Sequence, residues 1–250
     1  MVTVAAVPVK DLANAKQRLL PLLSAKERQR LVQAMIEDVL ITLSQAPLSE
    51  VIIVTRDPTV IELAREFSAT ILVEPENLGQ TEAVALAQRR AVAVGADAFL
   101  TIPGDVPLAT LEEIAAVLGS AGVTPAAVFV PSRSGLGTNA ALLAPPDLMP
   151  LTFGEPSFAN HLAAARRRGI TPLTLSLPGL GLDIDDPEDL RSVAESGRDP
   201  RETIAQYEPR LAEATPASAL AAVSSRLDPR KLVTVVVGDE SVLKPALAGL

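Results

Sequence analysis

The sequence contains no cysteine and no tryptophan, one tyrosine, and a single histidine, His161. Without cysteine the chain cannot form disulfides, thiolate zinc sites or a cysteine nucleophile, and one histidine cannot supply a histidine-rich metal site. Aromatic residues make up only 2% of the chain, whereas proteins that bind single-stranded nucleic acid stack the bases on aromatic rings. A net charge of -8 also disfavours a nucleic-acid phosphate backbone as a partner.

Long apolar runs are missing as well. No run approaches the roughly 18 residues of a membrane span, and the first residues, MVTVAAVPVK, lack the length and the basic start of a signal peptide. We therefore expect a cytoplasmic protein with no membrane partner. Hydrophobic residues nevertheless form 48% of the 250 residues, enough for a sizeable core built of Ala, Val, Leu and Ile.

Short apolar segments alternate with segments of helical periodicity along most of the chain. The expected strands are Thr3–Val7, Val51–Thr55, Ile71–Val73, a segment from Ala98, Ala126–Val130 and Thr171–Leu177. A capping box at Ser24–Glu27 and the pair Asp57-Pro58 mark two helix starts. The alternation predicts an α/β fold with a mostly parallel, doubly wound sheet and helices on both faces.

The stretch Ala98–Leu108, AFLTIPGDVPL, is the centre of the predicted site. Its apolar run ends at Pro103-Gly104 and delivers one acidic residue, Asp105, to the sheet edge where ligands bind in open α/β folds. Such a carboxylate suits a metal ion. The alternative is that Asp105 accepts backbone hydrogen bonds or caps the helix expected near Thr110.

A second acidic cluster follows the last expected strand, in GLDIDDPEDL. In an extended segment Asp183 and Asp185 point to the same side, and two such carboxylates repel each other unless a cation lies between them. Asp186, which precedes Pro187, suits a helix N-cap instead. With Asp105 the first two would give three oxygen ligands, as magnesium prefers.

Three cations, Lys10, Lys16 and Arg18, follow the first expected strand. Beside the backbone amides of a starting helix they are suited to hold a triphosphate. The alternative is a solvated basic helix face.

Two further segments carry small polar residues. Residues 131–148 contain Gly135, Gly137, Thr138 and Asn139, which is typical of a loop that lets a ligand approach the backbone, or of a hairpin with glycines in its turn. In Phe153–Phe158, Ser157 is expected to cap a helix over Phe158–Arg168, whose amino terminus beside Gly154 is either an anion site or a plain cap. His161, early in this helix, is interpreted as structural.

The motifs VPVK, AKQRL, TRDP, PGDVPL, GTNAALL, FGEPSF and LDIDDPEDL resemble, in this order, the guanylyltransferases that make the lactyl or enolpyruvyl diphospho-guanosine precursor of coenzyme F(420). The resemblance covers Met1 to about Glu195. The GDxP motif also occurs in sugar-phosphate and molybdopterin nucleotidyltransferases, so the order and spacing carry the resemblance. The chain departs from the pattern at Leu78–Ala83, where the family usually has Gly-Leu-Asn before a small residue.

The resemblance implies a Rossmann-like sheet of the nucleotide-diphospho-sugar-transferase type, with GTP as co-substrate and magnesium as cofactor. It implies metal ligands at Asp105, Asp183 and Asp185, contacts to the phosphorylated acid at Thr138, Gly154 and Ser157, and a catalytic basic motif at Lys10, Lys16 and Arg18. The implied reaction transfers GMP from GTP to phosphoenolpyruvate and gives enolpyruvoyl-2-diphospho-5'-guanosine and pyrophosphate.

Several alternatives stay open. The acceptor could be 2-phospho-L-lactate, 3-phospho-D-glycerate or a sugar phosphate, or the chain could be a non-catalytic nucleotide-binding or scaffold protein. A glycosyltransferase fits poorly, because Val106 and Pro107 follow Asp105 where that class has Asp-x-Asp.

The sequence divides into residues 1–195, the expected guanylyltransferase domain, and residues 196–250, a C-terminal extension of unknown role. The extension combines helical patterns broken by prolines with a short strand-like run, KLVTVVV. It resembles the carboxyl-terminal end of insulinase-type metallopeptidase domains but lacks their zinc-binding His-Glu motif. A homodimer, and direct transfer of a labile product to the downstream transferase of the coenzyme F(420) pathway, are further expectations.

Overall fold

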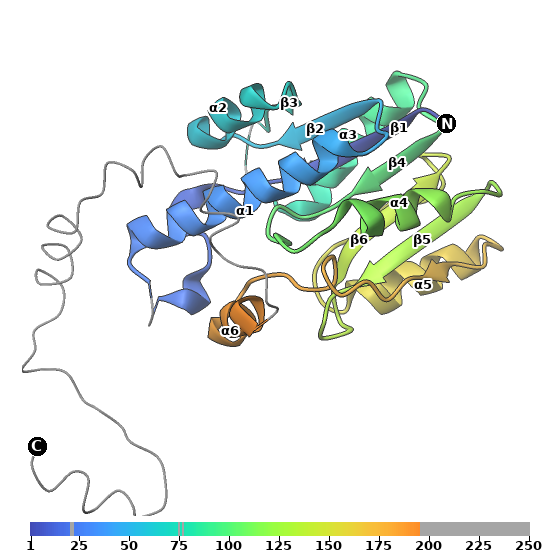
Figure 1. Ribbon diagram of the computed structural model, residues 1–250. Helices are drawn as coiled ribbons and strands as arrows, with labels where there is room; N and C mark the ends of the chain where they lie inside the picture. The colour runs from blue at the N-terminus through green and yellow to red at the C-terminus, as the bar shows by residue number, and fades with distance from the viewer. Residues whose placement is uncertain (21–22, 75, 77, 196–250) are drawn as a thin grey trace, which may run out of the picture. The chain divides into compact units, whose positions relative to one another are not determined.

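The computed structural model describes residues 1–20, 23–74, 76 and 78–195 (Figure 1). The predicted extension, residues 196–250, lies outside the described residues. Within them strands and helices alternate as the hydrophobic pattern predicts, except that two consecutive strands span Ala126–Pro131 and Thr138–Ala144.

In the described part of the chain seven strands form a single sheet of order β3-β2-β1-β4-β6-β5-β7. They are β1 (Thr3–Pro8), β2 (Glu50–Val54), β3 (Thr70–Leu72), β4 (Ala98–Thr101), β5 (Ala126–Pro131), β6 (Thr138–Ala144) and β7 (Leu173–Thr174). Central strand β1 pairs in parallel with β2 and β4, so Ala5 lies opposite both Val51 and Leu100. The predicted mostly parallel α/β sheet is confirmed.

One strand runs against the others. β6 is antiparallel to both β4 and β5, so the segment 131–148 is a hairpin and not an open loop. The N–H of Ser132 donates to the carbonyl of Gly137, and the N–H of Gly137 donates to Ser132 Oγ, which closes the turn. Thr138 and Asn139 therefore belong to a buried strand.

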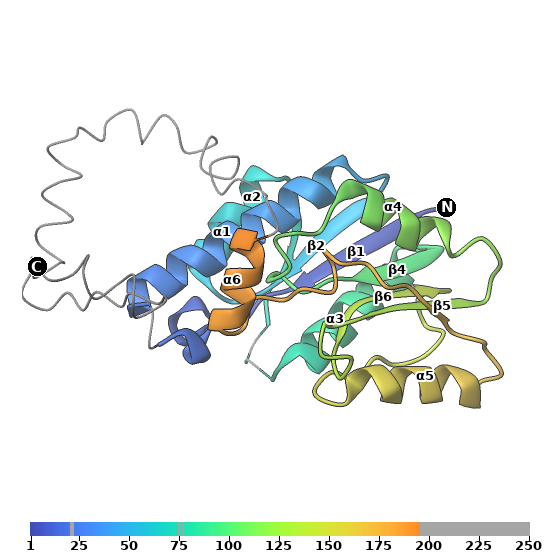
Figure 2. The same ribbon diagram turned by 60° about the horizontal axis from the view of Figure 1, so that its bottom comes forward.

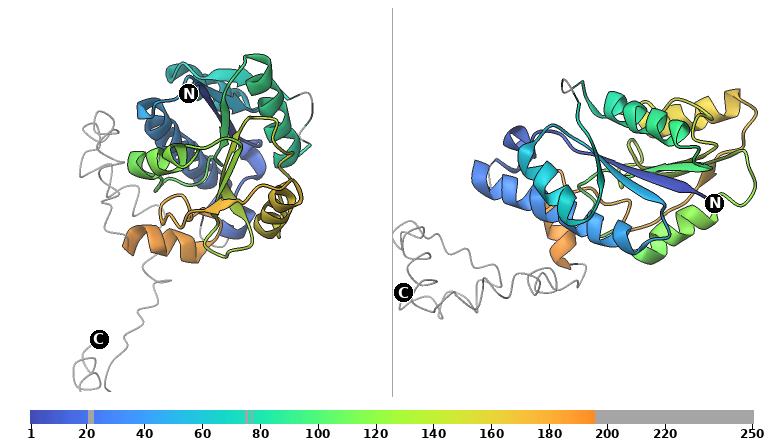
Figure 3. Two further views of the ribbon diagram at one scale, coloured as in Figure 1. Left: turned by 90° about the vertical axis from the view of Figure 1, so that its right-hand side faces the viewer. Right: turned by 90° about the horizontal axis from the view of Figure 1, so that it is seen from above.

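Helices cover both faces of the sheet (Figures 2 and 3). They are α1 (Ala25–Gln45), α2 (Pro58–Glu66), α3 (Gln80–Ala93), α4 (Leu111–Gly119), α5 (Ser157–Arg167) and α6 (Pro187–Glu195), with two 3-10 turns at Leu12–Asn14 and Gln17–Leu19. Because side chains of a strand alternate between faces, Val7 belongs to the apolar layer that includes residues of α1, α2 and α4, and Val4 belongs to the layer that includes residues of α3 and α5. The two apolar layers fix the sheet edge on which the site is built.

Helix caps follow the sequence pattern at two of the predicted starts. Ser24 and Glu27 form the capping box of α1, and Asp57 accepts from the first amides of α2. Thr110 caps α4, so Asp105 is not used there. The prediction that Ser157 caps α5 is wrong, since Pro156 holds the cap position without a side-chain hydrogen bond and the Ser157 hydroxyl bonds elsewhere.

Among the helices of the described ranges, none combines the length and the apolar character that crossing a bilayer requires.

Candidate active site

A cavity of about 800 Å³ opens where the chain leaves the sheet, and all nine residues singled out in the sequence line it. Pro8 ends β1, Pro103–Asp105 follow β4, and Ser132 follows β5. Because β6 runs antiparallel, its first residues reach the same edge as the carboxyl ends of β1 and β4. The reversed direction of β6 therefore places Thr138 at the same sheet edge as Asp105.

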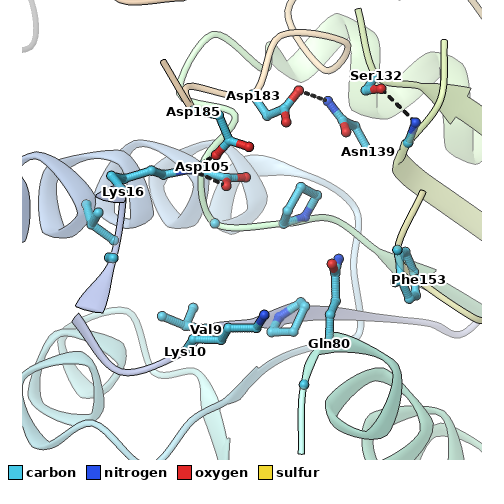
Figure 4. Close-up of a pocket in the computed structure, with 18 of the residues that line it drawn as sticks. Val9, Lys10, Lys16, Gln80, Asp105, Ser132, Asn139, Phe153, Asp183 and Asp185 are labelled. Carbon is cyan, nitrogen blue, oxygen red and sulfur yellow. Dashed lines mark hydrogen bonds and ion pairs between the residues drawn. The ribbon is translucent and has the colours of Figure 1, made fainter. Parts of the chain in front are cut away.

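The ammonium group of Lys16 lies between two carboxylates (Figure 4). Lys16 Nζ is 2.6 Å from Asp105 Oδ2 and 2.7 Å from Asp185 Oδ1. Burial lowers the pKa of Lys16, but the two carboxylates outweigh it, so the pKa stands above its usual value and the group stays charged. Lys16 adopts left-handed backbone angles, φ 51 and ψ 50, a conformation that costs a non-glycine residue about 1 kcal/mol or more and is concentrated at functional sites.

Asp183 is held separately from this pair. Its Oδ1 accepts a hydrogen bond of 3.1 Å from Asn139 Nδ2, and burial raises its pKa although this bond lowers it. Over the described ranges, no group of three or more histidine, cysteine or acidic side chains is arranged to hold a metal ion. The three aspartates thus share the cavity wall, with Lys16 supplying positive charge to two of them.

The donor chemistry nevertheless fits a hard divalent cation. Asp105 Oδ1 is buried and has no hydrogen-bond partner within the described structure, and a buried acceptor without a partner is costly unless a ligand meets it. Carboxylate oxygens are the ligands that magnesium prefers. Asp105, Asp183 and Asp185 are therefore the residues that would hold such an ion.

Backbone contacts fix the two acidic segments to each other. The N–H of Ile184 donates to the carbonyl of Asp105 at 3.0 Å, which sets the LDID segment beside the PGD turn. The backbone amides of Asp185 and Asp186 both donate to Asp189 Oδ2, at 2.9 and 3.0 Å. Asp186 in turn accepts from the first amides of α6, which is the capping role predicted for it.

Thr138, Ser157 and Gly154 also line the cavity. Thr138 and Ser157 are buried, and the Ser157 hydroxyl donates to Thr138 Oγ1 at 3.3 Å. Gly154 has a φ of 106, a backbone angle that side-chain-bearing residues rarely adopt.

The three cations differ in their surroundings. Lys10 is exposed at the cavity rim, while Arg18 is 75% exposed and lies 4.0 Å from Asp185. Only Lys16 is buried among the acidic residues. Sequence reasoning assigned all three to a triphosphate and did not anticipate the Lys16 ion pairs, because residues 89 and 169 positions away meet it only in the fold.

Asn139, which the sequence placed in the 131–148 segment as part of a loop or a hairpin, has a further role, because its Nδ2 donates to Asp183 Oδ1. A further residue of the cavity, Glu74, was not identified from the sequence. Glu74 is a mostly buried carboxylate just beyond β3, and burial followed by nearby Asp11 raises its pKa. Its signal was the one that identified Asp105, an acidic residue directly after a short apolar strand.

Comparisons with known proteins place the chain in a family. The family model described as guanylyl transferase CofC like matches residues 3–206. The chain is 41% identical to the phosphoenolpyruvate guanylyltransferase of Rubrobacter xylanophilus over 83% of this chain and 98% of that protein. It is 32% identical to the 3-phospho-D-glycerate guanylyltransferase of Colwellia psychrerythraea over 75% of this chain and 89% of that protein.

A solved structure supports the fold. A protein from Desulfovibrio desulfuricans G20, provisionally assigned as a nucleotide-diphospho-sugar transferase, superposes with a TM-score of 0.65 at 17% identity, over 80% of this chain and 89% of that one. At this identity the likeness concerns the sheet and its helices alone. The family match and the relatives show that the chain belongs to the CofC-like guanylyl transferase family.

Proposed function

We propose that this chain transfers GMP from GTP to phosphoenolpyruvate, giving enolpyruvoyl-2-diphospho-5'-guanosine and pyrophosphate, in the biosynthesis of coenzyme F(420). The observation that carries the proposal is a single cavity that joins the Lys16-braced aspartates to the Thr138 wall. The name of the Rubrobacter relative supports phosphoenolpyruvate as the acceptor.

The reaction needs no nucleophilic side chain. A phosphate monoester is largely dianionic at pH 7, since its second pKa is about 6, and its oxygen attacks the α-phosphorus of GTP directly. The new P–O bond forms as the bond from the α-phosphorus to the bridging oxygen breaks, and pyrophosphate leaves with that electron pair. Catalysis then consists of in-line positioning and charge neutralisation, which suits a chain without cysteine.

Each group of residues has a distinct task in this scheme. The exposed cations Lys10 and Arg18 contact the triphosphate, and Lys16 keeps Asp105 and Asp185 in place. Those two carboxylates with Asp183 hold magnesium, which when bound neutralises phosphate oxygens. Gly154, Thr138 and Ser157 meet the phosphorylated acid.

The test is pyrophosphate release from GTP and magnesium with phosphoenolpyruvate, 2-phospho-L-lactate and 3-phospho-D-glycerate offered separately, and with ATP as the nucleotide control. We expect release with GTP and phosphoenolpyruvate. Release with 3-phospho-D-glycerate alone, the acceptor in the name of the Colwellia relative, would show that the acceptor differs from the one proposed, while guanylyl transfer would stand as the reaction. Nucleotide binding without release from any acceptor would indicate a binding protein.

We also propose the finer assignments that accompany this activity. Residues 1–195 form the catalytic domain, the protein works in the cytoplasm, and a homodimer passes its product to the downstream transferase. The support for this handoff is chemical, because an enolpyruvyl diphosphate diester is expected to be labile. A product lifetime long compared with diffusion between enzymes would remove the reason for it.

A further inference from the structure

A buried chain of hydrogen bonds supports the cavity wall at Thr138. Thr138 Oγ1 lies 2.9 Å from His161 Nδ1 and 3.3 Å from the donating hydroxyl of Ser157. The three residues come from β6 and α5, and none is more than 5% exposed. The inference drawn from them rests on the proposed function, in which Thr138 meets the phosphorylated acid.

The backbone fixes which nitrogen of His161 carries the proton. The N–H of Thr152 donates to His161 Nε2 at 3.0 Å. A backbone N–H can only donate, so Nε2 must be unprotonated, and a neutral imidazole then carries its one proton on Nδ1. The bond to Thr138 is therefore donated by His161 and accepted by Thr138 Oγ1.

The residues around His161 keep its imidazole uncharged and hold the ring in one orientation. Phe129 stacks on it with centroids 5.4 Å apart, and Phe153 meets it edge-on at 5.3 Å. Burial lowers the pKa of His161 to about 4.

Thr138 Oγ1 accepts hydrogen bonds from His161 and Ser157, so both of its lone pairs are used. The hydroxyl can then form one more hydrogen bond, in which its own hydrogen is donated. We propose that His161 is a positioning residue that, together with Ser157, commits the Thr138 hydroxyl to donate a hydrogen bond into the cavity. A free hydroxyl either donates or accepts, whereas this one offers only a donor. It therefore favours the anionic oxygens of a phosphorylated acid and disfavours a ligand group that must itself donate.

Because the chain has a single histidine, the tautomer can be measured directly on the intact protein. Nitrogen-15 NMR of histidine-labelled full-length chain reports which ring nitrogen bears the proton, without any substrate. We expect the Nδ1-protonated tautomer, unchanged from pH 8 down to about pH 5. The Nε2-protonated tautomer, or titration near pH 6.5, would overturn the inference.

Kinetics with two matched variants test the effect on the substrate. H161F keeps an aromatic ring between Phe129 and Phe153 and removes both hydrogen bonds, while H161N places an amide N–H close to the position of Nδ1. We expect H161F to raise KM for phosphoenolpyruvate about tenfold, the size of one lost hydrogen bond to an anion, and to leave KM for GTP within about twofold. H161N should recover most of the loss.

A double variant separates positioning from plain structural support. T138V removes the donor itself, so adding H161F to T138V should raise KM for phosphoenolpyruvate no further. Additive effects, or an unchanged KM in H161F, would overturn the inference. If the wild-type protein releases pyrophosphate with none of the acceptors, the proposed function fails, and the NMR tautomer still tests whether His161 donates its hydrogen bond to Thr138.

Discussion

At the scale of single residues, the site depends on where one positive charge is placed. Lys16 is the buried cation of the cavity wall and contacts two carboxylates. Without it the neighbouring carboxylates of Asp105 and Asp185 would repel each other. The lysine therefore holds these two carboxylates together at the cavity wall.

Replacing Lys16 by methionine should lower kcat for pyrophosphate release at least about 100-fold, in the range found when one preorganised electrostatic contact is removed. Methionine keeps the apolar length and removes the charge. The matched control is K26M, since Lys26 is an exposed residue of α1. A wild-type value of kcat in K16M would show that the ion pairs of Lys16 are not needed for catalysis.

His161 also makes stability depend on pH. Its pKa is about 4 in the folded chain and about 6.5 when unfolded, so the unfolded state binds the extra proton between these values. The free energy of unfolding should therefore fall as pH drops from about 6.5 to 4, by about 3 kcal/mol in total. Denaturant titrations across this range measure it, with H161F as control. Equal pH slopes for the two proteins would argue against a neutral buried His161.

At the scale of elements, the segment between β7 and α6 presents Asp183 and Asp185. It is anchored by Glu113 of α4, whose carboxylate accepts from the amides of Gly179 and Leu180 at 2.8 and 2.9 Å. A Cβ at Gly179 would collide with the backbone carbonyl of Leu108, so the segment approaches α4 as closely as only glycine permits.

Gly179→Ala should destabilise the protein by about 1–3 kcal/mol, the usual range for inserting a group into packed space. It should also lower kcat, because the segment must move and carries two of the aspartates with it. Thermal unfolding and pyrophosphate release measure the two effects. The control is Gly119→Ala at the end of α4, where a Cβ meets nothing within 4 Å. An unchanged kcat in G179A would show that the anchoring of this segment at Gly179 does not affect the active-site aspartates.

At the scale of the whole molecule, the described sheet, its two apolar layers and the described residues of the cavity lie within the first 195 residues. A chain shortened to residues 1–195 should therefore keep kcat/KM within about twofold of the full-length value. The measurement is pyrophosphate release by both proteins at equal concentration. A large loss in the shortened chain would assign residues 196–250 a part in catalysis or assembly.

The sequence by itself determined the sheet class, most of the elements in their order, and nine of the residues that line the cavity. These are local properties, since period-two and period-3.6 apolar patterns and cap residues such as Ser24 and Asp57 act within a few neighbours. The family resemblance added the roles assigned to nine residues, which stay predictions.

Only the tertiary structure determined the contacts between segments that are distant in the sequence. The reversal of β6, the ion pairs of Lys16 and the bond from His161 to Thr138 each link residues far apart in sequence. The reversal escapes the pattern because a buried strand reads as the same apolar run in either direction. The sequence predicts Ser157 as a helix cap because a cap and a side-chain donor use the same residue type, and only the neighbouring strand distinguishes them.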